Sequence, residues 1–388
     1  MKKISIIFEG DIYKHRGEFV AIRNRIRELS KQKDVTLEVY VYFFYISDFI
    51  NRFLHFNSGK RIDYTIIDGI KYNCIWVKKS WMDYFTRKLF KKSTSFELDR
   101  LEKKIDLRSS DIIYAHSRLA GMVAYNYKKN YNIPFIVLWH GSSIHTSPFL
   151  DKTWYKQTKT VLTNSNFNLF VSDELQKISQ TIVSNSSMVS LNGVDTKKYQ
   201  PYDIEKKNQL KQSLNIPLEN KVVAYIGNYM SVKNVEFLPV LFSEINREFP
   251  NTSFYLVGSK KLLDLFSNSS VTDIRCIDNI SNDDMPDIYN IMDLIVLPSI
   301  NEGLPMTCLE AKACGINFIA SRVGGIADAI GIDNTVPRNE SFNKNFIELC
   351  IKSLMAEKKS SGLDPKFNLS QIVKNEYTLM SQIIDGKL

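Results

Sequence analysis

The chain has no CxxC pair, no long uncharged apolar run, no internal repeat and no low-complexity tract. Its five cysteines are scattered at Cys74, Cys276, Cys308, Cys314 and Cys350. An odd, unpatterned set of cysteines indicates reduced thiols, and it argues against both a zinc site and a disulfide framework. The chain also lacks the roughly 18 consecutive apolar residues of a membrane-spanning helix. The short apolar run at residues 4–8 is followed by an acid, so it predicts a strand and not a signal peptide.

What is present suits a globular protein of 388 residues, with 44% apolar and 12% aromatic residues. A chain of this length normally forms two domains. Charge is divided unevenly between the halves. Residues 1–200 contain 32 Lys and Arg against 19 Asp and Glu, whereas residues 201–388 contain 19 against 23. The basic first half indicates a polyanion or an anionic membrane surface as a partner.

Short β-rich runs alternate with helical patterns along the whole chain. This spacing predicts parallel sheets with both faces covered. The expected strands of the second half are residues 221–227, 252–258, 273–278, 293–299 and 316–322. Those of the first half lie near residues 3–10, 35–43, 111–117, 133–141, 160–165 and 187–193, with a hairpin at 64–77 that turns at Asp68 and Gly69. We expect an α/β fold of two doubly wound, Rossmann-like domains facing across a cleft, divided as 1–198, 199–365 and a C-terminal helix at 366–388 that crosses back to the first domain.

The segment SINEGLPMTCLEAKACG carries two glutamates, Glu302 and Glu310, with seven residues between them. Pro305 is expected at the first helical position, which would leave the amides of Met306, Thr307 and Cys308 without intrahelical partners. Such amides attract anions, whereas the two acids would repel a bare phosphate. A nucleotide-sugar resolves the conflict, because its diphosphate can meet the amides while its hydroxyls meet the acids.

This segment, followed by AKACGINFIASRVGGIAD, resembles the signature of glycosyltransferase family 4. Residues 190–195, 226–234, 114–121 and 15–19 also resemble that family's segments in order and spacing. The resemblance implies the GT-B fold and a retaining, metal-independent hexosyltransferase without a cofactor. The implied donor is a nucleotide-diphosphate sugar, most commonly a UDP-sugar. The implied acceptor is a glycan, plausibly lipid-linked, in bacterial-type surface polysaccharide or glycolipid synthesis.

The resemblance also implies roles for individual residues. Glu302, Lys233 and His116 would be catalytic: Glu302 holds the hexose, Lys233 neutralises the diphosphate and His116 lies at the reacting sugar. Glu310 would bind the ribose hydroxyls. The remaining donor-binding positions are Gly17, Asn228, Gly303, Leu304, Pro305, Met306 and Thr307, and no metal ligand is expected.

One position departs from the family. Asn228 stands where the family usually has an arginine, so the diphosphate clamp has one cation fewer. Arg16 and Lys260 are candidates to replace that charge. His140, in LWHGSS, ends another predicted strand and is a further candidate for the site.

Residues 76–96 interleave lysines and arginines with aromatic residues. Such a segment suits either an anionic membrane surface or a helix that packs its aromatics inward, and nothing resembles a nucleic-acid-binding module. We expect a cytoplasmic protein, peripheral on the inner face of the cell membrane. Two other functions fit the pattern: a nucleotide-sugar epimerase of the same architecture, and a non-catalytic nucleotide-sugar-binding relic. A dinucleotide-dependent oxidoreductase does not fit, because no GxGxxG follows a predicted strand.

Overall fold

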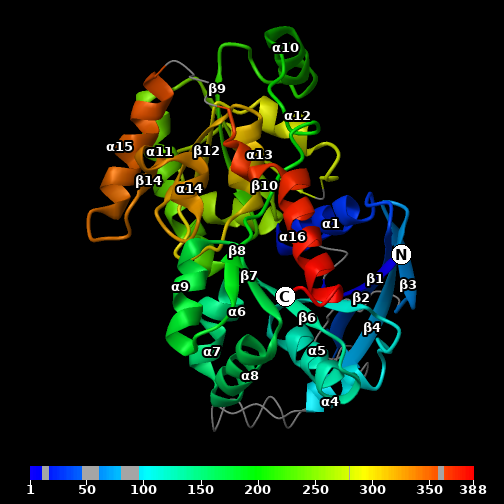
Figure 1. Ribbon diagram of the computed structural model, residues 1–388. Coiled ribbons are helices and arrows are strands. Elements are labelled where there is room, and N and C mark those ends of the chain that lie inside the picture. The colour runs from blue at the N-terminus through cyan, green and yellow to red at the C-terminus, as the bar shows by residue number, and fades with distance from the viewer. Residues whose placement is uncertain (11–16, 46–60, 80–95, 279, 357–361) are drawn as a thin grey trace. The chain divides into compact units, whose positions relative to one another are not determined.

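The computed structural model describes residues 1–10, 17–45, 61–79, 96–278, 280–356 and 362–388. The chain divides into two compact units (Figure 1). Unit 1 comprises Met1–Leu191 and Ser370–Leu388, and unit 2 comprises Asn192–Leu369. The sequence had placed the first boundary after residue 198 and the second after residue 365.

Unit 1 is built on one sheet with the strand order β3-β4-β2-β1-β5-β6-β7-β8. All neighbours are parallel except β3, which runs antiparallel to β4. The β3–β4 hairpin turns at Asp68 and Gly69, both with positive φ, so the predicted turn is confirmed. The strands are β1 Lys2–Glu9, β2 Val35–Tyr45, β3 Tyr64–Ile67, β4 Ile70–Lys78, β5 Ile112–His116, β6 Phe135–Trp139, β7 Phe167–Phe170 and β8 Ser187–Val189.

The helices of unit 1 connect these strands, and the C-terminal helix joins the same unit. Every residue of β5 and β6 is buried, as expected for central strands covered on both faces. The helices are α1 Gly17–Leu29, α4 Phe96–Glu102, α5 Ser117–Tyr131, α6 Ser142–His145, α7 Ser147–Leu150, α8 Lys152–Asn164, α9 Asp173–Ile182 and α16 Leu369–Ile384.

The strand expected at residues 160–165 is wrong, because these residues form the end of α8 and the cap residue that follows it. The threonines and valine of this run favour a strand when they are considered alone. The helix begins at Lys152 and is capped by Asp151, whose carboxylate accepts hydrogen bonds from the amides of Thr153 and Trp154. Its buried residues include Val161 and Leu162, so tertiary packing overrides the local preference. The strand follows at β7.

Unit 2 contains a six-stranded parallel sheet in the order β11-β10-β9-β12-β13-β14. Helices α11 and α15 pack together, and so do α12 and α13, which lie on the other face of the sheet (Figure 1). The strands are β9 Lys221–Gly227, β10 Thr252–Gly258, β11 Ile274–Asp278, β12 Leu294–Leu297, β13 Asn317–Ser321 and β14 Thr335–Val336. The five strands predicted for this half are therefore confirmed.

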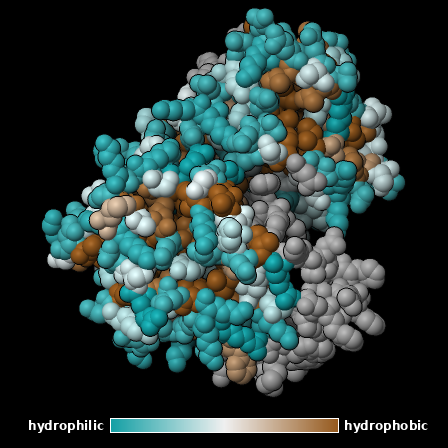
Figure 2. All heavy atoms as spheres, turned by 90° about the vertical axis from the view of Figure 1, so that its right-hand side faces the viewer, coloured by the Kyte–Doolittle hydropathy of each residue, from teal (hydrophilic) through white to brown (hydrophobic). Residues whose placement is uncertain are grey.

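The α-helices and short 3₁₀ segments of unit 2 complete the doubly wound pattern. The α-helices are α10 Ile204–Ser213, α11 Leu238–Glu248, α12 Met285–Asn290, α13 Met306–Ala313, α14 Ile326–Ile330 and α15 Phe342–Met355. The 3₁₀ segments are η1 Ser231–Lys233, η2 Val235–Phe237, η3 Lys260–Phe266, η4 Ile332–Asn334 and η5 Pro365–Phe367. On the face shown in Figure 2, hydrophobic residues are scattered among hydrophilic ones over the described surface. No described helix is both long enough and apolar enough to cross a bilayer.

A buried ion pair fixes the C-terminal helix to unit 1. The guanidinium of Arg25 in α1 donates to Glu376 of α16 at 3.1 Å, and both side chains are almost completely inaccessible to solvent. Tyr114 and Ser190 also donate to the Glu376 carboxylate, at 3.0 and 2.5 Å. Arg25 further donates to the carbonyl of Leu191 at 2.7 Å. Because both charges are paired and hydrogen-bonded, the cluster is tolerated in the core.

Replacing Glu376 with Gln should destabilise unit 1 by about 3–5 kcal/mol, because the Arg25 charge would remain buried without its partner. Urea unfolding followed by circular dichroism measures this loss. Asp385→Asn is the matched control, since Asp385 pairs with Lys2 at the exposed end of the same terminal segment and its loss should change little. Equal midpoints for Glu376→Gln and wild type would contradict the assignment of this cluster.

Candidate functional site

The cation and the first acid of the predicted site meet in unit 2. Lys233 ends η1, which follows β9, and Glu302 lies in the loop that follows β12. These strands are parallel neighbours, so their carboxyl ends lie at one edge of the sheet, where such folds bind ligands. The Nζ of Lys233 is 2.5 Å from Oε1 of Glu302, and the hydroxyl of Ser299 donates to the same oxygen at 2.7 Å. The amide of Ile300 donates to the carbonyl of Val232 at 2.8 Å and ties the two loops together.

This ion pair is sheltered from solvent. The side chain of Lys233 is 22% exposed and that of Glu302 is 9% exposed. Lys233 therefore offsets the negative charge that Glu302 would otherwise place beside the N-terminus of α13. An anion that approaches this helix would meet a cation and a neutralised acid, and not a bare carboxylate.

The N-terminus of α13 differs from the expectation by one residue. Pro305 has φ −65° and ψ 133°, so it caps the helix in an extended conformation, and Met306 is the first helical residue. The amide of Cys308 donates to the carbonyl of Pro305 at 3.2 Å, so it is not one of the unpartnered amides. The amides of Met306 and Thr307 precede the first intrahelical hydrogen bond and are the ones placed to meet an anion.

The loop of Glu302, Gly303 and Leu304 is held by two distant segments of unit 2. Asn192 is buried, and its side-chain amide donates to the carbonyl of Leu304 at 2.8 Å. Gly324, with φ +56°, packs so closely that a Cβ there would lie 2.3 Å from the Gly303 carbonyl oxygen and 2.4 Å from that of Glu302. The amide of Gly325 donates to the Gly303 carbonyl at 2.6 Å. Gly324 is thus required by a close backbone approach, whereas Gly325 contributes only its backbone amide.

Glu310 has different partners from Glu302. It lies in α13, is 5% exposed, and accepts a hydrogen bond from the hydroxyl of Tyr289 at 2.7 Å. Burial raises the pKa of Glu310 above its ordinary value, whereas hydrogen bonds from Tyr289 and Tyr199 oppose that shift. The structure therefore places the second acid in a tyrosine-lined interior and not in the Lys233 ion pair.

The remaining predicted donor-site residues are placed as follows. Gly17 is the first residue of α1 in unit 1, and a Cβ added there would meet open space. Asn228 is exposed just after β9, and its carbonyl accepts from the hydroxyl of Tyr225 at 3.0 Å. Lys260 begins η3 after β10 and lies 3.6 Å from Asp278. Arg16 lies outside the described residues, as do residues 80–95 of the basic aromatic segment.

The two candidate histidines meet in unit 1. His116 ends β5 and His140 follows β6 directly, and the Nδ1 of His116 is 3.1 Å from the Nε2 of His140. Burial is the first cause that lowers the pKa of His116 well below its ordinary value, and it lowers that of His140 to about 3. Both rings are therefore neutral at physiological pH.

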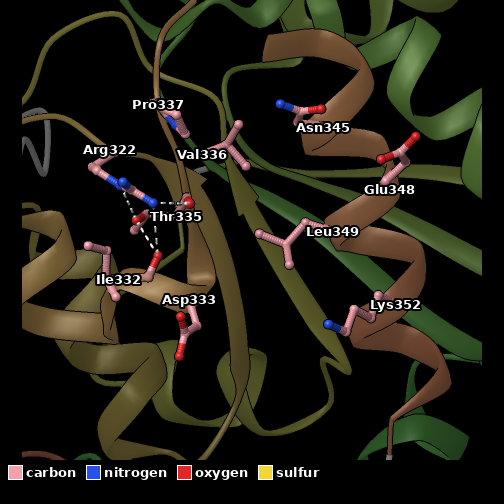
Figure 3. Close-up of a pocket in the computed structure, with 10 residues that line it drawn as sticks. All are labelled: Arg322, Ile332, Asp333, Thr335, Val336, Pro337, Asn345, Glu348, Leu349 and Lys352. Atoms are coloured by element: carbon pink, nitrogen blue, oxygen red, sulfur yellow. Dashed lines mark hydrogen bonds between the residues drawn. The ribbon is translucent and has the colours of Figure 1, made fainter. Parts of the chain in front are cut away.

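A surface cavity of about 360 Å³ lies elsewhere in unit 2 (Figure 3). It is lined by residues of β14, η4 and α15, and none of the predicted site residues is among them. Arg322 at its edge already donates to the hydroxyl and carbonyl of Thr335 and to the carbonyl of Ile332. Among the described residues, no group of three or more His, Cys, Asp and Glu side chains could hold a metal ion.

Comparison with known proteins indicates the fold and the class of protein. Residues 206–357 match the family model "Glycosyl transferases group 1", so unit 2 carries a group 1 glycosyltransferase domain. The chain is 26% identical over 222 residues to a putative teichuronic acid biosynthesis glycosyltransferase, TuaC, of Bacillus subtilis, covering 57% of this chain and 55% of that protein. It is also 26% identical over 265 residues to an Escherichia coli UDP-Gal:alpha-D-GlcNAc-diphosphoundecaprenol alpha-1,3-galactosyltransferase, covering 64% and 65%. The chain thus matches only about half to two thirds of the length of these relatives.

Solved structures establish the GT-B fold over the whole chain. Sucrose-phosphate synthase from Thermosynechococcus elongatus superposes with a TM-score of 0.73 at 15% identity, covering 100% of both chains. Anabaena Alr3699/HepE in complex with UDP and glucose gives a TM-score of 0.70 at 15% identity, covering 98% of this chain and 100% of that one. At this identity the likeness shows the fold alone.

Three residues that contact the site were not among the predicted ones. Ser299 donates to Glu302, Asn192 holds the Leu304 carbonyl, and Tyr289 donates to Glu310. Asn192 belongs to residues 190–195, a segment that resembles glycosyltransferase family 4, but no role was predicted for it. Nothing in the local sequence distinguishes Ser299 or Tyr289 from other residues of their types, because their partners come from other elements.

Gly324→Ala should displace the backbone of Glu302 and Gly303 and weaken the binding of nucleoside diphosphates by about tenfold or more, equivalent to at least ~1.4 kcal/mol. Isothermal titration with UDP and GDP measures this change. Gly331→Ala is the matched control: Gly331 also has a positive φ, of +87°, but its Cβ would meet only the Asn334 side chain at 3.7 Å. Equal weakening by both variants would show that backbone strain alone is responsible, not the close approach.

Glu310→Gln should make the protein more stable than wild type at neutral pH. Since burial raises the pKa of Glu310, the folded chain keeps a proton that the unfolded chain releases. The stability from this proton is full below the unfolded pKa and is lost as pH rises through the folded pKa. Glutamine keeps an acceptor for Tyr289 without the charge, so its advantage should grow as the pH rises above about 4, the ordinary pKa of a glutamate. Thermal melts of both proteins at a series of acidic to neutral pH values test the direction of this change. A stability advantage of Glu310→Gln that shrinks as the pH rises would contradict the prediction.

Proposed function

We propose that the protein is a retaining, metal-independent hexosyltransferase of glycosyltransferase family 4 that uses a nucleotide-diphosphate sugar, most plausibly a UDP-sugar. One observation carries the proposal: the Lys233–Glu302 ion pair lies beyond adjoining strand ends of a group 1 glycosyltransferase domain, with Lys233 at the end of η1 and Glu302 in the loop that leads into α13. A cation and two unpartnered amides suit a diphosphate, and an adjacent carboxylate suits sugar hydroxyls.

In the proposed reaction the diphosphate binds the amides of Met306 and Thr307. The ammonium group of Lys233 then moves away from Glu302 and toward the oxygens of the diphosphate. The bond between the anomeric carbon and the β-phosphate oxygen breaks, and its electron pair leaves with the nucleoside diphosphate. The acceptor hydroxyl oxygen forms the new bond on the same face of the sugar, and its proton passes to the departing phosphate oxygen. Lys233 stabilises the growing negative charge, so the reaction requires no metal ion.

Glu302, once released from Lys233, accepts hydrogen bonds from hexose hydroxyls, and Glu310 receives the ribose. We propose that His116 contacts the transferred sugar. The proposed acceptor is a lipid-linked glycan, in line with the undecaprenol-linked substrate in the name of the Escherichia coli relative. The basic composition of residues 1–200 supports a place at the inner, anionic face of the cell membrane.

Purified protein incubated with a panel of nucleotide-sugars, a polyprenyl-diphosphate-linked sugar acceptor and a chelator tests the proposal by mass spectrometry of the product. Glu302→Gln and Lys233→Ala should each lower kcat by about 100-fold, as removal of one preplaced charge does elsewhere. Lys344→Ala, an exposed lysine on α15 of the same unit, is the matched control and should retain full activity.

Three outcomes would contradict the proposed transferase activity or its mechanism. Donor binding without transfer to any acceptor would favour the non-catalytic relic. This alternative is specific because Asn228 stands where the family usually has an arginine. Conversion of the donor without an acceptor would favour the epimerase. Full activity of both variants would remove Lys233 and Glu302 from the mechanism.

A further inference from the structure

The histidine pair of unit 1 is a closely coupled unit at the carboxyl edge of the sheet. Its rings are nearly parallel, with centroids 5.5 Å apart and 16° between their planes, in addition to the Nδ1–Nε2 contact of 3.1 Å. His116 is 2% exposed and His140 is 7% exposed. Neither ring makes another side-chain hydrogen bond to the described part of the chain. Because the Nδ1 of His116 is engaged by His140, Nε2 is the ring atom that remains for a ligand.

The groups around the pair keep it neutral. Tyr114 of β5 stacks on His116, with ring centroids 4.7 Å apart. The ring of Phe8 of β1 forms a T-shaped pair with His116, with ring centroids 6.2 Å apart. The positive charge of Arg25 on α1 disfavours a second positive charge on either ring. Glu376 of α16 lies behind Tyr114 and Arg25 and is hydrogen-bonded to both. The Glu376 carboxylate is thus occupied by partners other than the histidines.

Two neutral imidazoles that share one hydrogen bond have linked tautomers. If His140 donates from Nε2, the Nδ1 of His116 accepts and its Nε2 must carry the proton. If His116 donates from Nδ1, both rings take the Nδ1–H form. The Nε2–H form is the more stable tautomer of an isolated histidine side chain, so the first arrangement satisfies the preference of both rings at once.

The backbone next to each histidine is unusual as well. Ser117, which follows His116, has φ +67°, a conformation that is uncommon for a residue other than glycine. Gly141, which follows His140, has φ +20° and ψ −105°. A residue other than glycine persists in this conformation only where the surrounding structure fixes it. The strand end at His116 is thus held in an uncommon backbone conformation.

We propose that His140 is a positioning residue: its Nε2–H donates to the Nδ1 of His116, so that His116 presents a fixed Nε2–H as a hydrogen-bond donor to an oxygen atom of the transferred sugar. His116 then binds the sugar and does not act as a general base. The identity of the ligand rests on the proposed function, whereas the coupling of the two rings does not.

Long-range proton–nitrogen NMR of the ¹⁵N-histidine-labelled protein tests the coupling directly. The chain has only five histidines, and the His116→Gln spectrum assigns His116. The expected wild-type result is an unprotonated Nδ1 and a protonated Nε2 on His116. In His140→Leu the two nitrogen shifts should move toward each other, because both tautomers become populated. In His140→Gln, whose amide can donate in place of Nε2, they should stay separate. A protonated Nδ1 in wild-type His116, or shifts unchanged in His140→Leu, would overturn the proposal.

Kinetics then test the positioning role. His140→Leu should lower kcat by about tenfold, the effect of one lost hydrogen bond, with a smaller change in donor KM, and His140→Gln should recover most of that loss. Equal loss in both variants would indicate a purely structural role and would contradict the proposal. The NMR measurement needs no turnover, so a locked pair in a protein without transfer activity would refute the proposed function alone. Thermal melts establish that each variant is folded, and the wild-type spectrum decides the tautomer even if His140→Leu does not fold.

Discussion

The neutralisation of Glu302 by Lys233 is the constraint on which the unit 2 site depends. A carboxylate beside the N-terminus of a helix competes with any anionic ligand for the same positive potential. The structure resolves this by placing a lysine from the neighbouring strand end 2.5 Å from that carboxylate. The ion pair joins the two segments that surround the site. In the proposed function it supplies a cation for a phosphate and a hydrogen-bond acceptor for a hydroxyl.

The backbone around this pair is held with little freedom. Asn192 fixes the Leu304 carbonyl, and the close approach of Gly324 fixes those of Glu302 and Gly303. Asn192 and Gly324 are both distant in sequence from the loop that they hold. The proposed sugar-nucleotide site would benefit from such support, because preplaced charges and amides stabilise a transition state without having to reorganise.

Unit 1 uses buried charge differently. Its Arg25–Glu376 pair binds the C-terminal helix to α1, and Tyr114 of β5 connects the same cluster to the stacked His116. The C-terminal segment is therefore part of the surroundings of the histidine pair, even though it lies far from it in sequence. Removal of the helix would expose a buried charge and disturb the ring that supports His116.

The sequence by itself determined the alternation of strands and helices, the Asp68–Gly69 hairpin turn and the candidate residues at strand ends, because these depend on local periodicity and turn chemistry. It was wrong at residues 160–165, where β-branched residues lie in a helix whose packing decides the outcome. Only the tertiary structure separated Glu302, paired with Lys233, from Glu310, buried among tyrosines, and only it joined His116 to His140. Such partners come from different elements, so their contacts follow from the three-dimensional arrangement of the strand ends and cannot be read from spacing along the chain.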